Sequence, residues 1–409
     1  TSFGTGLQAT LDSGVLQLSI DEIVVPSDGI GDDDAVAETT TFTITYSARV
    51  DNVASNQNAV GLVNDADASA DGTVDDNDNQ ASVTVVEPDL VVTKSIQGGV
   101  GDGTNLDAGD FVVYEIVVAH SGASTSDAFE VDLTDNFPAR LDNLTLLSAE
   151  VDDGATQTDV SARFDLTANA LTTTADIDLL RNTNGANHQT LTVVVRGEVV
   201  DTVAIGDTLD NTATVDYSSQ DGDQPNERDD TASGDAPQLT VNGTFAVSKS
   251  AGATTTAVVG DVIEYTLTVE LAEGTTRNIS IDDNLPEGVV YLNDAAIDAA
   301  GAVSSFGSGL QAALVGSQLR LDLDEVVVPG AGTSDDALET TQFTITYSVR
   351  VDDVAAIQNG VNLVNDADAS ADGLPDDVDN QASVTVVEPD LLVTKSIQGG
   401  VGDGTNLDA

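Results

Sequence analysis

The 409-residue chain contains no cysteine, methionine or tryptophan, and lysine and arginine together number only 12. Without cysteine, disulfides and zinc–thiolate sites are excluded, so any covalent cross-link must come from other chemistry. No stretch is long and apolar enough to be expected to span a membrane as a helix. The chain also lacks a P-loop, a nucleophile elbow and a zinc-binding motif, and we therefore do not expect an enzyme.

Basic residues are scarce while acidic residues are abundant. Aspartate and glutamate number 71, which gives a formal net charge of −59 at pH 7. A charge of this size excludes nucleic acid and anionic membranes as partners. The self-repulsion must be neutralised, either by calcium held in acidic loops or by a high-salt environment. The sequence is compatible with both.

The residues that are present favour β-structure. Aromatic residues make up 4% of the chain, and short alternating runs of apolar and polar residues recur between Gly, Asp, Asn and Pro. No long apolar stripe of helical period occurs. This pattern predicts an all-β chain of tandem antiparallel β-sandwiches arranged as a linear array.

The chain is internally repetitive. TVVEPDLVVTKSIQGG at 84–99 returns nearly unchanged as TVVEPDLLVTKSIQGG at 385–400, and a weaker repeat relates GDFVVYEIVV to GDVIEYTLTV. We therefore expect a window on a longer repetitive polymer. The predicted modules are the C-terminal part of a sandwich at 1–87 (a copy of 304–388), full sandwiches at 88–238 and 239–388, and the first strand of a further module at 389–409 (a copy of 88–108).

The chain has three lysines, Lys94, Lys249 and Lys395, and two of them begin full modules. Residues two apart in a strand share a face. Lys94 therefore lies on the face of Leu90 and Val92, and Lys249 lies on the corresponding apolar face. The same parity turns one aspartate and one asparagine of each full module inward. These residues are Asp135 and Asn211 in the first module and Asp283 and Asn365 in the second, with Asn64 as the counterpart in the first partial module.

Burial favours the neutral forms of lysine and aspartate. A neutral lysine is a nucleophile, and a protonated carboxyl group beside a carboxamide polarises it and transfers protons. These groups meet the requirements of an intramolecular Lys–Asn isopeptide bond formed with loss of ammonia. The alternative is a buried Lys–Asp ion pair with the asparagine as a hydrogen-bond partner. Strand parity leaves both open.

The succession DLVVTKS, GDFVVYEIVV, VDLTDNFP and LDNTATV resembles a repeat domain found in many copies in bacterial and archaeal surface proteins (domain-of-unknown-function eleven type). It is also similar to the isopeptide-forming domains of Gram-positive pilins. The second module matches less closely, because NDADA replaces NTATV. The resemblance implies immunoglobulin-like sandwiches and the Lys, Asp and Asn positions named above, with Glu115 or Glu264 as the alternative acid.

Two kinds of acidic segment are candidate calcium sites. DASADGTVDDND at 67–78 and its copy at 368–379 partly match a calcium-binding loop, with Ser at the third position and Asp in place of the final Glu. The candidate ligands are Asp67, Ser69, Asp71, Asp75 and Asp78, and Asp368, Ser370, Asp372, Asp376 and Asp379. The alternative is a solvated acidic hairpin loop. A weaker signal lies at the module junctions, at Glu87, Asp89, Glu388 and Asp390.

Together these observations predict a structural repeat segment of an extracellular adhesin stalk or cell-surface filament, cross-linked by isopeptide bonds and rigidified by calcium. The expected partners are other copies of the repeat, joined head to tail, and neighbouring cells or surfaces. The alternatives are a repeated module that binds glycans or ice, and a protein similar to those of surface layers. Few aromatic residues and no regular threonine array favour the structural prediction.

Overall fold

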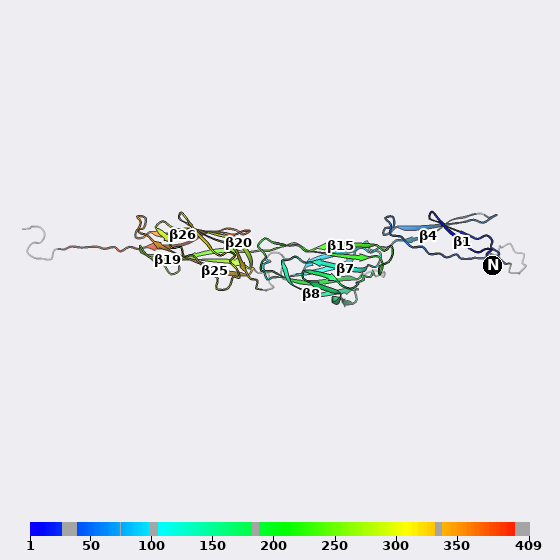
Figure 1. The fold of residues 1–409 in the computed structure, drawn as a ribbon, viewed down its shortest axis with the longest axis horizontal. Coiled ribbons are helices and arrows are strands. Elements are labelled where there is room, and N and C mark those ends of the chain that lie inside the picture. Colours follow the sequence, from blue (N-terminus) through cyan, green and yellow to red (C-terminus); the bar gives the residue numbers. More distant parts are fainter. Residues whose placement is uncertain (27–38, 74, 98–104, 182–187, 332–337, 397–409) are drawn as a thin grey trace, which may run out of the picture. The chain divides into compact units, whose positions relative to one another are not determined.

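A computed structural model describes the chain except for residues 27–38, 74, 98–104, 182–187, 332–337 and 397–409, and except for the side chain of residue 78. The chain divides into two compact units, Thr1–Asp51 and Asn52–Ala409. Figure 1 shows strands along both units, and the described residues contain no α-helix and one 3₁₀ turn, Ser161–Arg163. None of the described segments forms a helix long and apolar enough to cross a membrane. The predicted all-β class is confirmed.

The smaller unit contains one hairpin, formed by β1 (Gln8–Asp12) and β2 (Val15–Ser19). The two-residue turn at Ser13 and Gly14 has positive φ at both positions, 51° and 84°, which suits the right-handed twist of a hairpin. Both strands are exposed, including Leu11 at 73%. The alternating pattern predicts that the apolar residues of these two strands face a core, but in this unit they are exposed.

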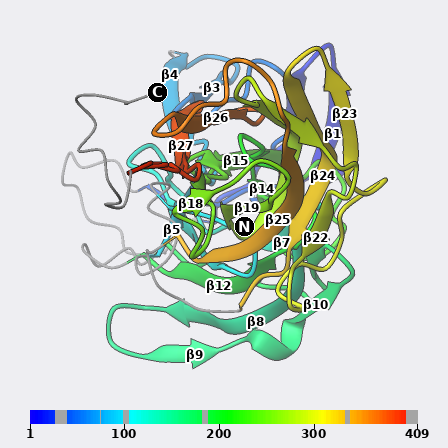
Figure 2. The ribbon, with the colours of Figure 1, turned by 90° about the vertical axis from the view of Figure 1, so that its left-hand side faces the viewer.

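The larger unit starts with a hairpin of β3 (Gly61–Ala68) and β4 (Asp76–Thr84), followed by a sandwich of two five-stranded sheets. One sheet has the order β5 (Leu90–Ile96), β6 (Phe111–His120), β12 (Thr190–Val199), β8 (Leu141–Asp152) and β9 (Gln157–Asp159). The other has the order β10 (Phe164–Thr167), β11 (Ala170–Thr173), β7 (Phe129–Asn136), β14 (Thr212–Ser218) and β15 (Asp229–Asp235). Figure 2 shows β12, β8 and β9 side by side.

A second sandwich follows, after a short pairing of β13 (Thr208–Leu209) with β16 (Leu239–Thr240). Its first sheet has the order β17 (Phe245–Ser250), β19 (Val262–Ala272), β25 (Thr340–Val351) and β21 (Val289–Tyr291), and β22 (Ala296–Asp298) also pairs with β25. Its second sheet has the order β18 (Thr256–Ala257), β27 (Asp377–Val386), β26 (Asn362–Ser370), β20 (Gly274–Asn284), β24 (Gln318–Val328) and β23 (Gln311–Val315).

Each sandwich has its own apolar core. In β12 and β19 the residues alternate between buried and less buried, as expected for strands with one face toward a second sheet. The first core runs from Leu90 to Val241 and the second from Phe245 to Val386. Since Leu239 and Val241 pack in the first core, this core extends past residue 238, where we predict the module boundary. The described residues thus form two separate apolar cores, one in each sandwich.

Candidate functional site

Lys94 and Lys249 each reach from one sheet of their sandwich to the other. Nζ of Lys94, on β5, lies 2.6 Å from Oδ2 of Asp135 on β7. Nζ of Lys249, on β17, lies 2.5 Å from Oδ2 of Asp283 on β20. All four side chains have 0% exposure. The first and second modules therefore hold equivalent buried Lys–Asp pairs that connect their two sheets.

The predicted asparagines lie on the same sheet and face as the aspartates. Ala213 of β14 is the register partner of Asp135, and Ala367 of β26 is the partner of Asp283. Asn211 and Asn365 precede these alanines by two positions, so they are diagonal neighbours of the aspartates. Both asparagines are buried, with 4% and 0% exposure.

Aromatic rings surround both lysine amines. Nζ of Lys94 lies 5.1 Å from the ring centre of Tyr114 and 5.4 Å from that of Phe137. Nζ of Lys249 lies 5.2 Å from the ring centre of Tyr265 and 5.7 Å from that of Tyr347. Such rings exclude water and also attract a cation. The lysines are thus shielded from solvent, and the neighbouring aspartate is their charged hydrogen-bond partner.

Burial shifts the pKa values of both members of each pair toward the neutral forms. It lowers the pKa of Lys94 and of Lys249 to about 8, against the opposing effect of the aspartates. Burial also raises the pKa of Asp135 and of Asp283, although the lysines counteract it. A lysine pKa near 8 provides an appreciable fraction of neutral amine near neutral pH, as a nucleophile requires.

The hydrogen bonds of the two asparagines differ. Nδ2 of Asn365 donates to the hydroxyl of Tyr347 at 2.7 Å, and this hydroxyl donates to Oδ2 of Asp283. Neither polar atom of the Asn211 side chain has a hydrogen bond of acceptable geometry among the described residues, although this carboxamide is one of the groups that lower the pKa of Asp135. Asn211 is therefore close to Asp135 but held by fewer contacts than Asn365.

Tyr347 is a site residue that the sequence analysis missed. It belongs to β25 and shares the inward face of Phe343 and Ile345, so parity marks it as a core residue. Its register partner is Tyr265, whereas the equivalent Tyr114 of the first module is paired with Val195. Parity gives no indication that the hydroxyl group lies between Asp283 and Asn365.

The alternative acids and the partial copies lie elsewhere. Glu115 and Glu264 alternate with the inward tyrosines of their strands and point away from the core, which favours Asp135 and Asp283 as the acids. Asn64 is exposed in β3, opposite Ala81. Lys395 is exposed and outside any described strand. Among the described residues, only the full modules bring all three residue types together.

The acidic segment at 368–379 forms the β26–β27 hairpin. It brings Asp368 and Asp379 together with Asp366, and one carboxylate oxygen from each of the three lies within 4.8 Å of the others. Oδ1 of Asp366 is buried and has no hydrogen-bond partner among the described residues. Asp372, in contrast, accepts a hydrogen bond of 2.6 Å from Nδ2 of Asn278, and Asp376 is exposed. The predicted loop therefore gathers only part of its ligand set; Ser370 is paired with Ser280 in the sheet.

The copy at 67–78 is the β3–β4 hairpin. Asp67 lies at the end of β3 and Ser69 directly follows this strand, while Asp71 and Asp75 lie in the turn; all four are exposed. Asp78 belongs to β4, and its side chain lies outside the described part of the structure. Calcium binding by the described residues of this copy therefore remains a prediction.

The predicted junction residues have other partners. Glu87 forms an ion pair with Arg228 and accepts a hydrogen bond of 2.9 Å from the backbone nitrogen of Asn58. Asp89 accepts a hydrogen bond from the hydroxyl of Ser121. Glu388 accepts one of 3.1 Å from the backbone nitrogen of Asn359, and Asp390 is exposed. Arg228 already neutralises Glu87, which weakens the prediction of an ion there.

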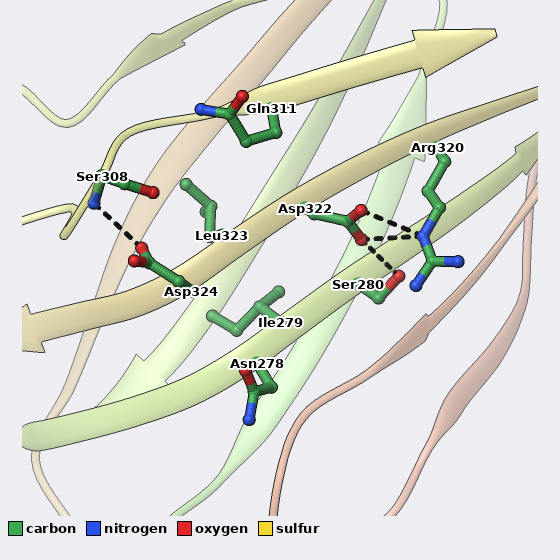
Figure 3. A pocket seen from close by; sticks show the side chains of 9 residues that line it. All are labelled: Asn278, Ile279, Ser280, Ser308, Gln311, Arg320, Asp322, Leu323 and Asp324. Atoms are coloured by element: carbon green, nitrogen blue, oxygen red, sulfur yellow. Dashed lines mark hydrogen bonds and ion pairs between the residues drawn. The ribbon is translucent and has the colours of Figure 1, made fainter.

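A hollow of about 240 Å³ lies beside β20, β23 and β24, with side chains from all three strands around it (Figure 3). Its polar groups largely satisfy one another. Nε of Arg320 donates to both carboxylate oxygens of Asp322 at 3.0 Å, and Ser280 donates to the same carboxylate at 2.7 Å. This mutual pairing leaves little to recognise a glycan.

No protein-family model matches the chain, and no curated protein matches it by sequence. Among solved structures, it is similar to the C-terminal domain of an antigen I/II-family protein of Streptococcus pyogenes (11% identity, 72% of this chain and 99% of that one, TM-score 0.29). It is also similar to the T6 backbone pilin of Streptococcus pyogenes (10% identity, 76% of this chain and 70% of that one, TM-score 0.30). The major pilin of Streptococcus agalactiae shares 12% identity over 73% of this chain and 91% of that fragment, with a TM-score of 0.28. Similarities this low do not indicate function.

Proposed function

We propose that this chain is a structural repeat segment of an extracellular adhesin stalk or cell-surface filament, in which a Lys–Asn isopeptide bond cross-links each full module. The observation that carries the proposal is the buried Lys–Asp pair beside a buried asparagine in both modules. Sheet-to-sheet cross-links at equivalent positions suit a protein that must resist unfolding under tension.

In the first module, the neutral Nζ of Lys94 attacks Cγ of Asn211. A C–N bond forms between them, and the bond from Cγ to Nδ2 breaks. Protonated Asp135 polarises the carboxamide oxygen and transfers the proton that the lysine nitrogen loses to the departing nitrogen, so that ammonia leaves and Asp135 ends as it began. The lowered pKa of Lys94 and the raised pKa of Asp135 both favour the starting protonation states. Lys249, Asp283 and Asn365 would react in the same way.

The position of the bond gives it a mechanical role. Lys94 lies on the first strand of its module, and Asn211 precedes the late strand β14 on the opposite sheet. Tension between the module ends would pass through the covalent bond instead of separating hydrogen-bonded strands. By analogy with a disulfide closing a loop of similar size, each bond would stabilise its module by about 5 kcal/mol through the unfolded state.

The proposed partners are further copies of the repeat, joined head to tail. Residues 52–87 are a near copy of 353–388, and Arg228 of the following module donates to the backbone oxygen of Asn56 at 2.9 Å and pairs with Glu87. Glu388 is held by Asn359 as Glu87 is held by Asn58. The end of the second module therefore has the groups needed to receive another module of the first type.

Calcium at the β26–β27 hairpin is part of the proposal, because Asp366, Asp368 and Asp379 offer oxygen ligands close together. There the ion would neutralise like charges on adjacent strands. It would supplement the isopeptide bonds, which do not depend on it.

Intact-mass measurement of the full chain tests the cross-links. Two bonds would place the mass about 34 Da below that of the sequence, about 17 Da for each ammonia lost. We expect Lys94→Ala and Lys249→Ala each to remove one increment, and Asp135→Ala to block the first bond with Lys94 and Asn211 still present. Lys395→Ala is the matched control, since this lysine is exposed. A full sequence mass for the mature wild-type chain would leave only buried ion pairs.

A further inference from the structure

The first and second full modules meet at a tightly packed junction. Thr275 forms a parallel bridge with Ala204, and its backbone nitrogen donates to the oxygen of Val203 at 2.8 Å. A Cβ atom on Gly330 would lie 2.5 Å from Cα of Gly109, so only glycine allows this approach of the two backbones. The junction is therefore a built interface with defined contacts.

Three carboxylates from the two modules converge there. Asp107 and Asp110 precede β6 in the first module, Glu339 precedes β25 in the second, and one oxygen from each lies within 4.8 Å of the others. The backbone nitrogen of Asp107 donates to Oδ2 of Asp110 at 3.0 Å, and that of Glu339 donates to Oδ2 of Asp107 at 3.2 Å. These hydrogen bonds fix the carboxylates across the junction.

One oxygen of Asp107 and one of Glu339 lack a partner in the described part of the chain. Asp107 has 0% exposure, and its Oδ1 has no hydrogen-bond partner among the described residues; the buried Oε2 of Glu339 likewise has none. None of the ion pairs found in the described parts of the chain involves Asp107 or Glu339. A buried carboxylate in such surroundings needs either a proton or a cation.

We propose that Asp107, Asp110 and Glu339 bind a calcium ion that fixes the first full module to the second. The groups that the described residues offer here are carboxylate oxygens, which suit a hard cation, and calcium tolerates the irregular geometry that three side chains from two modules impose. The site differs from the acidic hairpins and from Glu87, which has Arg228 as its counter-charge. It is independent of the isopeptide bonds, so the two proposals fail separately.

Calcium binding by the full chain tests the site. Calcium per chain is counted by equilibrium dialysis for the wild type, Asp107→Asn and the more exposed Glu339→Gln, with circular dichroism to check folding. We expect each variant to bind one ion fewer than the wild type, whereas Asp165→Asn, which changes an exposed acid of β10, binds the wild-type number. Equal numbers in the wild type and in both cluster variants would overturn the proposal.

The melting temperature gives a second test, because the effect of Asp107→Asn on it should have opposite signs in chelator and in calcium. In chelator, Asp107→Asn should raise the melting temperature, because it removes a buried acid that has to take up a proton or stay charged without a counter-charge. In calcium it should lower the melting temperature relative to the wild type, because the ion stabilises only the folded wild-type junction. A shift of the same sign and size in both conditions would mean that a proton alone neutralises the cluster, and would reject the calcium site.

The absence of native cysteine allows spin labels to report on the junction. With Thr145→Cys and Gln342→Cys, at exposed positions of β8 and β25, calcium should narrow the distribution of distances between the labels. The same labelled chain carrying Asp107→Asn should show no narrowing. If calcium narrows both distributions equally, the cluster does not fix the junction.

Discussion

The two lysine sites differ mainly at one position. Tyr265 of the second module is paired with Tyr347, whereas the equivalent Tyr114 is paired with Val195. In the first site the second aromatic ring beside the lysine is that of Phe137, and the second module has Leu285 at the equivalent position. The second site therefore has a hydroxyl group that connects Asp283 and Asn365, whereas the buried hydroxyl of Tyr114 in the first site has no hydrogen-bond partner among the described residues.

This difference bears on reactivity. In the second site, the bond from Asn365 to Tyr347 satisfies part of the carboxamide before any reaction. In the first, both polar atoms of Asn211 lack a hydrogen bond of acceptable geometry among the described residues. A buried carboxamide with fewer hydrogen bonds leaves the unreacted state higher in energy. We therefore expect the isopeptide bond to form faster in the first module than in the second.

Replacing either lysine should have the largest effect on stability, and the loss should differ between the two modules. Lys94→Ala eliminates a cross-link that contributes about 5 kcal/mol and leaves buried Asp135 without the lysine nitrogen as its hydrogen-bond partner. Lys249→Ala eliminates the same cross-link, but the hydroxyl of Tyr347 still donates to Asp283, so the loss should be smaller. Calorimetry of the two variants, with Lys395→Ala as control, measures the losses. Equal losses would show that Tyr347 does not support Asp283.

The pH dependence of stability should distinguish cross-linked modules from modules that lack the isopeptide bond. In Asn211→Ala and Asn365→Ala chains the lysine amines stay free, with a folded-state pKa of about 8 against an ordinary lysine pKa of 10.5. Because the unfolded state then binds more protons between these values, stability should rise as the pH increases from about 8 to 10.5. The gain is on the order of 1–3 kcal/mol per module. Urea unfolding at several pH values measures it.

The wild type provides the contrast for this titration. An amide nitrogen does not titrate in this range, so a cross-linked module should lack the gain. A wild-type chain that gains as much stability as the asparagine variants would show that its lysines are free amines.

Tyr347→Phe should convert the second site toward the first. Loss of the hydroxyl leaves Asn365 without its partner and removes one donor to Asp283, which should destabilise the unreacted module by about 1–3 kcal/mol. The final mass deficit should be unchanged, while the second increment of about 17 Da should appear sooner after the newly synthesised chain first folds. Time-resolved mass spectrometry of the chain made by cell-free synthesis measures this. A slower increment would mean that the hydroxyl assists the reaction.

Much of this arrangement follows from strand parity alone. Alternation predicts that Lys94, Asp135 and Asn211 turn inward, and the structure buries all three. The β-sandwich class follows from the same alternation. Parity describes one strand at a time, however, and the hydroxyl of Tyr347 acts between strands of opposite sheets. The carboxylates of Asp107 and Glu339 likewise meet only through the packing of two modules, more than 200 residues apart in the chain.

The ligands of the β26–β27 hairpin also could not be predicted fully from the sequence. Substitutions there should have the smallest effect on stability. The calcium-loop template includes both Asp368 and Asp376, but only Asp368 lies within the cluster formed with Asp366 and Asp379. Asp368→Asn should therefore reduce the stabilisation of the chain by calcium by about 1 kcal/mol, the value for an ion present at several times its dissociation constant. Asp376→Asn, at an exposed position of the same hairpin, should leave that stabilisation unchanged. Melting temperatures with and without calcium measure both variants. If Asp376→Asn has the larger effect, the template describes the ligands better than the cluster does.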